Sequence, residues 1–139
     1  MAKNHHTKDK GDLRFLKAIA EMCSQGYTIL VPMTEHATYD CVIEKDGKFK
    51  RVQCKYRSLD KTGTINIQFK SSWADRNGTH VQKIDKKNVD IYAIYCPDVE
   101  KVFFIEPEMF DTSVTIRVKN PKNNQKANVR IADDYLLVP

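Results

Sequence analysis

The sequence predicts an α/β fold in which helices flank a central mixed β-sheet. Three observations support this prediction: a helical apolar pattern over residues 12–25, a hairpin pattern over residues 39–56, and two apolar strand patterns over residues 89–96 and 101–105. The chain has 139 residues, about the usual size of one domain. We therefore expect a single domain over residues 1–139, with a polar and flexible segment at residues 1–10.

Residues 12–25 form the predicted helix. Asp12 suits its first turn, where a carboxylate interacts favourably with the helix dipole, and Gly26 suits the position just after its end. The expected core-facing stripe consists of Leu13, Leu16, Ile19, Ala20 and Cys23.

The pattern around Asp46-Gly47 predicts a two-residue β-hairpin turn between residues 39–45 and 48–56. If the turn is centred on this pair, Lys45 lies opposite Lys48, and every other cross-strand pair follows from that register. One face of the hairpin is then apolar and suits the core; it carries Cys41, Ile43, Val52 and Cys54.

The opposite face of the hairpin gathers three polar side chains. In the same register Asp40 faces Gln53, and Lys55 is a diagonal neighbour of Asp40 at about 7–8 Å. A carboxylate can hold a hard cation such as Mg²⁺, and a nearby ammonium can stabilise charge that grows at phosphorus. Phosphodiester hydrolysis is one reading; a cross-strand ion pair between Asp40 and Lys55 is the structural alternative.

The other elements follow from strand and turn patterns. We expect strands at residues 27–31, 64–70 and 114–118, a helical turn at 106–111, and a small helix or docked segment at 129–137. Residues 71–87 are polar without a period, which predicts a long DNA-contacting loop. Residues 120–139 are expected to form a C-terminal tail.

The positive charge is concentrated in one stretch. Residues 45–61 carry seven basic and two acidic side chains, an excess that equals the formal net charge of +5. Such a patch favours a polyanionic partner, above all nucleic acid, although a lysine-rich strand that resists aggregation is the alternative.

The four cysteines lack metal-site spacing, and no apolar run would span a membrane. We therefore expect free thiols, an intracellular, cytoplasmic protein and no membrane contact.

The motifs together resemble those of a known nuclease superfamily. The chain resembles the PD-(D/E)xK nucleases, whose restriction-endonuclease-like core has the same order of elements, and within them the small bacterial group I intron-encoded homing endonucleases. The resemblance is carried by Lys10-Gly11-Asp12, Asp40, Gln53-Cys54-Lys55, and residues 89–97, 123–126 and 130–135. It covers most of the chain.

The resemblance implies metal-dependent cleavage of double-stranded DNA by a bacterial or phage-type enzyme. Asp40 and the backbone carbonyl of Cys54 would hold Mg²⁺, for which Mn²⁺ could substitute. Lys55 would position the attacking water or stabilise the transition state, and Gln53 would orient a metal-bound water. One position departs from the family pattern, because Phe15 stands where a helix glutamate is usual. Asp12 or Glu44 is then a possible replacement, or the site has fewer carboxylates.

Substrate contacts and assembly complete the expectations. A double-strand break needs two active sites, so we expect a homodimer or homotetramer. The alternatives are a structure-specific nuclease such as a Holliday junction resolvase and a catalytically impaired DNA-binding protein. Asn and Gln amides can read adenine, and Arg can read guanine. The expected DNA contacts are Lys48, Lys50, Arg57, Ser71, Ser72, Arg76, Asn77, Asn123, Asn124, Gln125 and Lys126.

Overall fold

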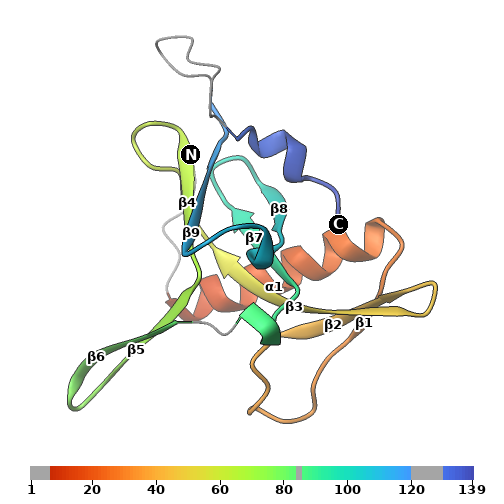
Figure 1. Cartoon of the computed structure of the whole chain (residues 1–139), viewed down its shortest axis with the longest axis horizontal. Coiled ribbons are helices and arrows are strands. Elements are labelled where there is room, and N and C mark those ends of the chain that lie inside the picture. Colours follow the sequence, from red (N-terminus) through yellow and green to blue (C-terminus); the bar gives the residue numbers. More distant parts are fainter. Residues whose placement is uncertain (1–6, 84–85, 120–129) are drawn as a thin grey trace.

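A central five-stranded sheet lies between one long helix and a two-stranded ribbon (Figure 1). The computed structural model describes residues 7–83, 86–119 and 130–139. The sheet has the order β1-β2-β3-β7-β8, with β3 and β7 parallel and its other neighbours antiparallel. The expected mixed sheet with a packed helix is therefore confirmed. The sheet strands are β1 (Thr28–Leu30), β2 (Cys41–Lys45), β3 (Lys48–Tyr56), β7 (Ile91–Cys96) and β8 (Lys101–Ile105).

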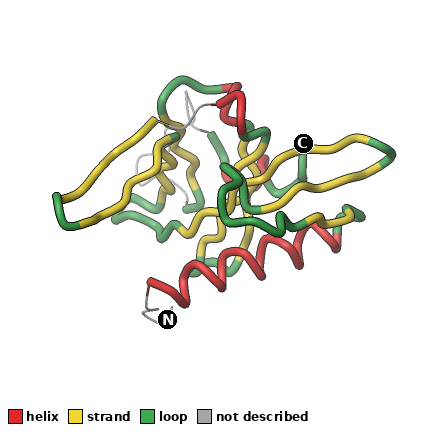
Figure 2. The backbone as a smooth tube through the Cα atoms, turned by 90° about the horizontal axis from the view of Figure 1, so that it is seen from below, coloured by secondary structure: helices red, strands yellow, loops and turns green. Residues whose placement is uncertain are grey.

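The remaining elements surround that sheet. Helix α1 (Thr7–Ser24) runs along one side of it (Figure 2). The other described elements are β4 (Thr64–Gln68), β5 (Lys70–Asp75), β6 (Gly78–Lys83), η1 (Lys86–Asn88), η2 (Pro107–Met109), β9 (Ser113–Arg117) and η3 (Ala132–Tyr135).

The β2–β3 hairpin has the turn that its sequence predicts. Asp46 and Gly47 both have positive φ, 54° and 77°, as a type I′ turn requires. Cross-strand pairs run from Lys45 opposite Lys48 to Cys41 opposite Val52, so the expected register is confirmed over β2.

Both faces of the sheet are buried, so two apolar clusters form. On one face, Ala18 and Met22 of α1 pack against the apolar face of the hairpin. On the other face, residues of β7 and β8 pack against the β4–β9 ribbon, with Phe103 fully buried. Strand β7 is buried at every position, as expected for a parallel strand covered on both sides.

Helix α1 corrects two expectations. It begins at Thr7 and not at Asp12, so residues 7–10 are helical, while residues 1–6 lie outside the described residues. Its buried positions are Ala18 and Met22, whereas Leu16 is 63% exposed and Cys23 is exposed. Of the expected stripe, Leu13 does pack against the core, whereas Leu16 and Cys23 do not. A helix packs through whichever face fits the sheet, and the small Ala18 permits a close approach.

Two further corrections concern the middle of the chain. Residues 71–87, expected as a loop, largely form the β5–β6 hairpin, which projects from the body in Figures 1 and 2. Its strands lack apolar alternation, so no strand period could be recognised in the sequence. Strand β4 does not join the main sheet but pairs with β9. Strand β9 begins at Ser113, one residue before the predicted segment 114–118, and otherwise lies within it. The expected helical turn is confirmed as η2, and η3 lies within the small helix expected at 129–137.

We expect Phe103→Ala to lower the free energy of unfolding by about 3–5 kcal/mol, because it removes a fully buried ring from between two layers. Phe49→Ala is the matched control: its ring is 63% exposed, and the expected change is within about 0.5 kcal/mol. Urea titration followed by circular dichroism measures both. Equal losses in the two variants would contradict the layer assignment.

Candidate active site

A local irregularity places Asp40 at the point where β2 and β3 separate. We call this point, which contains Asp40 and Cys54, the fork. The backbone N–H of Asp40 donates to the carbonyl of Val52 at 2.9 Å, although Val52 already pairs with Cys41. Two residues thus oppose one, as in a β-bulge, and the expected pairing of Asp40 with Gln53 is replaced. The Asp40 carboxylate instead accepts the backbone N–H of Cys54 at 2.7 Å. It occupies the place where β2 would otherwise have continued the ladder.

This bond also locates the carbonyl of Cys54. In a strand, the N–H and C=O of one residue point toward the same neighbouring strand. Because the Cys54 N–H points to Asp40, its carbonyl lies on the same edge of β3. The fork therefore combines one carboxylate with one backbone oxygen.

Lys55 is buried beside the fork. Only 8% of it is exposed, and its ammonium lies 5.5 Å from the centre of the Tyr92 ring. Burial, and after it the charges of Arg57 and Arg14, lower the pKa of Lys55 to about 8, and the charge of Asp40 opposes this shift. Within the described residues no ion pair joins Lys55 to Asp40, so the structural alternative of a cross-strand salt bridge is not observed.

Two polar groups near Lys55 have no protein partner. Gln53 is half-buried beside Tyr92, and its amide makes no hydrogen bond to the described residues. The buried hydroxyl of Tyr92 also lacks a partner there, and burial raises its pKa. Both groups are available to water or to a bound ligand.

The family pattern implies a glutamate from helix α1 near the fork, but this helix brings a cation there instead. Phe15 is half-buried and packs against the core of the sheet, so it adds no metal ligand. The preceding residue, Arg14, lies close enough for its charge to lower the pKa of Lys55 and Arg57. The sequence reasoning missed Arg14. The available signal was its position next to Phe15, at the departure from the family pattern.

Neither proposed carboxylate replacement contacts Asp40 within the described residues. Asp12 is exposed, and no described contact connects it with Asp40. The carboxylate of Glu44 accepts the backbone N–H of Gly47 at 2.9 Å, at the hairpin turn. Among the described residues, no three His, Cys, Asp or Glu side chains cluster as metal ligands. The donor set at the fork is thus one carboxylate and one backbone oxygen, and such oxygen donors fit a hard divalent cation.

The expected DNA contacts fall into four groups. Arg57 is half-buried near Lys55, and Arg76 and Asn77 are exposed at the β5–β6 turn, with Ser71 and Ser72 on β5. Lys48 and Lys50 lie at the other end of β3, Lys48 roughly 23 Å along the strand from Lys55. The expected contacts that lie outside the described residues are Asn123, Asn124, Gln125 and Lys126.

Comparison with known proteins assigns this fold to a class of nucleases. The family model of the PD-(D/E)XK endonuclease matches residues 5–138, and the chain belongs to that family. Its members generally use divalent metals. A solved bacterial homing endonuclease, I-Ssp6803I, has a similar fold, with a TM-score of 0.71, 20% sequence identity, and coverage of 94% of this chain and 88% of that chain. No curated protein sequence matches. No helix among the described residues is long and apolar enough to cross a membrane.

The pKa of Lys55 predicts a pH effect on stability. The folded protein releases the Lys55 proton near pH 8, whereas the unfolded chain holds it up to about pH 10.5. Between these values the unfolded state binds more protons, so the free energy of unfolding rises with pH, by on the order of 3 kcal/mol. Lys55→Met should lose this rise and be more stable than wild type at pH 7. Urea titrations of both proteins from pH 7 to 10.5 measure it; parallel profiles would refute the assignment.

Proposed function

We propose that the protein is a metal-dependent, site-specific endonuclease of the homing type that hydrolyses phosphodiester bonds in double-stranded DNA. The observation that carries this proposal is the buried Lys55 beside the fork formed by Asp40 and Cys54, in a chain of the PD-(D/E)XK family. A lysine in an otherwise apolar layer lowers stability, which favours a functional reason for its presence.

Each side chain at the fork has a proposed role. Asp40 and the carbonyl of Cys54 hold Mg²⁺ or Mn²⁺, which supplies charge neutralisation at the phosphate and a more acidic bound water. Lys55 donates a hydrogen bond to the scissile phosphate or to the attacking water. With a pKa of about 8, it can carry its proton at neutral pH and release it readily. Gln53 orients the water through its unbonded amide.

The charge balance of the fork sets the order of binding in this proposal. Lys55, Arg57 and Arg14 bring three cations to a single carboxylate, Asp40. Such a site repels a free divalent cation and attracts a phosphate. In this proposal DNA therefore binds first, and Asp40 with the carbonyl of Cys54 would hold the metal ion once the phosphate has offset the positive charge.

Target recognition is assigned to two parts of the chain. The β5–β6 hairpin extends beyond the body and carries Arg76 and Asn77 at its exposed turn, where they can reach a groove (Figure 1). Residues 123–126 supply further amide donors in the proposal. Cutting both strands requires two copies of the site, hence a homodimer or homotetramer. Three buried free thiols suit a reducing, cytoplasmic setting.

The first test is nicking of supercoiled plasmid that carries a library of candidate sites, with Mg²⁺ and then Mn²⁺. We expect metal-dependent cleavage at a mapped site. Lys55→Ala should lower the rate by roughly 100-fold or more, because it removes a charge placed at the developing negative charge. DNA binding should be retained.

Two other outcomes would select the alternatives. Preferential cutting of a four-way junction over a linear duplex would indicate a junction resolvase. Salt-sensitive binding with no cleavage in either metal would indicate a DNA-binding protein that has lost turnover. The specific observation that favours this last alternative is Phe15, whose ring packs into the core where a ligand is expected.

Arg14→Gln tests the proposed order of binding. Removing this cation should lower the Mg²⁺ concentration at half-maximal cleavage several-fold and weaken DNA binding in the presence of a chelator. Arg14→Lys keeps the charge and is the matched control. Cleavage titrated with Mg²⁺, together with fluorescence anisotropy in EDTA, separates the two effects. An unchanged Mg²⁺ requirement would refute a role of Arg14 in the charge balance.

A further inference from the structure

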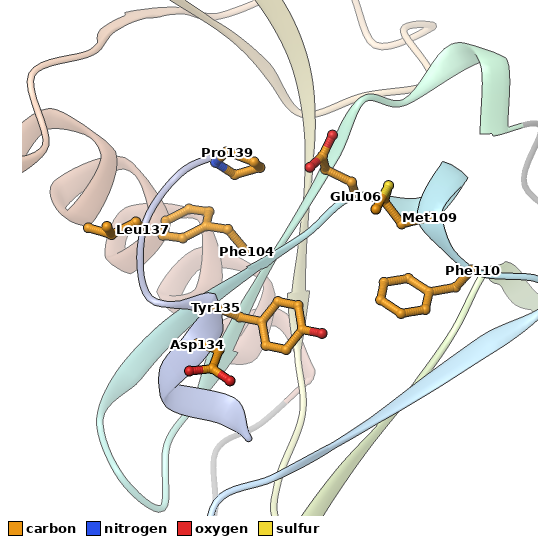
Figure 3. Close-up of a pocket in the computed structure, with 8 residues that line it drawn as sticks. All are labelled: Phe104, Glu106, Met109, Phe110, Asp134, Tyr135, Leu137 and Pro139. Atoms are coloured by element: carbon orange, nitrogen blue, oxygen red, sulfur yellow. The ribbon is translucent and has the colours of Figure 1, made fainter. Parts of the chain in front are cut away.

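A hollow lined by both carboxylates and apolar side chains lies at the β8 edge of the sheet, away from the fork. We call it the acidic hollow. It has a volume of about 220 Å³ and is lined by side chains of β8, η2, η3 and the segment after η3 (Figure 3). Glu106 and Asp134 are its exposed carboxylates, and Met109 and Leu137 are 72% and 77% exposed. The other lining residues are Phe104, Phe110, Tyr135 and Pro139.

This hollow has the chemistry of a site for a cationic side chain. Aromatic rings and carboxylates together attract an ammonium or guanidinium group. The Phe110 ring already attracts one such group, since the guanidinium of Arg130 lies 5.0 Å from its centre. The exposed Met109 and Leu137 add apolar area, which is typical of a surface that contacts protein. A phosphate backbone would be repelled here.

A second hollow, of about 250 Å³, has the opposite charge. It lies at the base of the β2–β3 hairpin, lined by Tyr27, Lys45, Asp46, Lys48, Lys50 and Pro139. Two of its three lysines are already engaged, because Lys50 donates to the carbonyl of Pro139 and Lys45 to that of Gln25. Within the described residues Lys48 makes no hydrogen bond or ion pair, so its ammonium is available.

The two hollows adjoin each other, because Pro139 lines both. A two-fold axis near Pro139 would bring the acidic hollow of one copy against the basic hollow of the other, and the reverse contact would form at the same time. This is the self-complementary arrangement of an isologous dimer. The hairpin lysines are far along β3 from Lys55, so such a contact leaves the fork accessible.

We propose that the acidic hollow around Glu106 and Asp134 receives Lys48 from a second copy of the chain, and that the reciprocal contact makes the protein a two-fold homodimer. The inference deepens the proposed function, since it gives the surface that would bring two cleavage sites together. It reassigns Lys48 and Lys50 from DNA contact to protein contact. It does not depend on cleavage, because it concerns the protein without DNA.

The test is sedimentation velocity of the full chain, without DNA, over a range of micromolar concentrations at low salt. We expect a dimer that weakens as ionic strength rises, because the paired charges are near the surface. Lys48→Glu and Asp134→Lys should each weaken dimerisation by about tenfold or more, since each creates two like-charge contacts. Lys61→Glu and Glu108→Lys, at exposed residues outside both hollows, are the matched controls and should leave the dimer unchanged.

The decisive step is to mix the two variants. In an equimolar mixture of Lys48→Glu and Asp134→Lys, each contact of a heterodimer again pairs opposite charges, so dimerisation should recover. A monomeric wild type at every concentration, or a mixture that remains monomeric, would overturn the proposal. Failure of cleavage with an intact dimer would count against the proposed function alone.

Discussion

The parallel pairing of β3 with β7 is the constraint on which the rest of the structure depends. Arg51 fixes it: its side chain donates to both oxygens of Asp90 at 3.0 and 3.1 Å, and its backbone N–H donates to the same carboxylate at 2.7 Å. These bonds hold Asp90 in register before β7 begins and depress its pKa. With β7 in place, β3 is an inner strand of the sheet, between β2 and β7, and Lys55 near its end is buried.

The chemistry of the fork follows from that burial. A strand buried on both sides normally carries apolar residues, and Lys55 departs from this rule within a layer that contains Tyr92 and Ile94. Its ammonium is stabilised by a ring face and by the nearby charge of Asp40, and two arginines act against it. The fork is thus a strained electrostatic site held by a well-packed frame, as expected where function competes with stability.

The packed sheet places the proposed DNA contacts and the proposed protein contacts on different parts of the surface. The two hairpins project on opposite sides of the body, one with amide and guanidinium groups at its turn and the other with lysines near the C-terminal residues (Figure 2). The fork and the acidic hollow have opposite charge character. In the proposed scheme this separation allows one copy to contact DNA and another copy simultaneously.

The sequence by itself determined the local features. Asp46-Gly47 specifies a type I′ turn. The turn fixes the register of β2 and β3, because a two-residue loop allows only one alignment of the two strands. The sequence also predicted the apolar strands, and its motifs carried the resemblance to the nuclease family. Only the tertiary structure decided which face of α1 packs, the bulge at Asp40, and the charge that Arg14 brings to the fork. These features depend on how layers fit together, and residues distant in sequence meet through packing that local periodicity does not encode. The strands of the β5–β6 hairpin escaped prediction for a related reason: their sequence has no apolar alternation, and only the pairing of the two strands defines them.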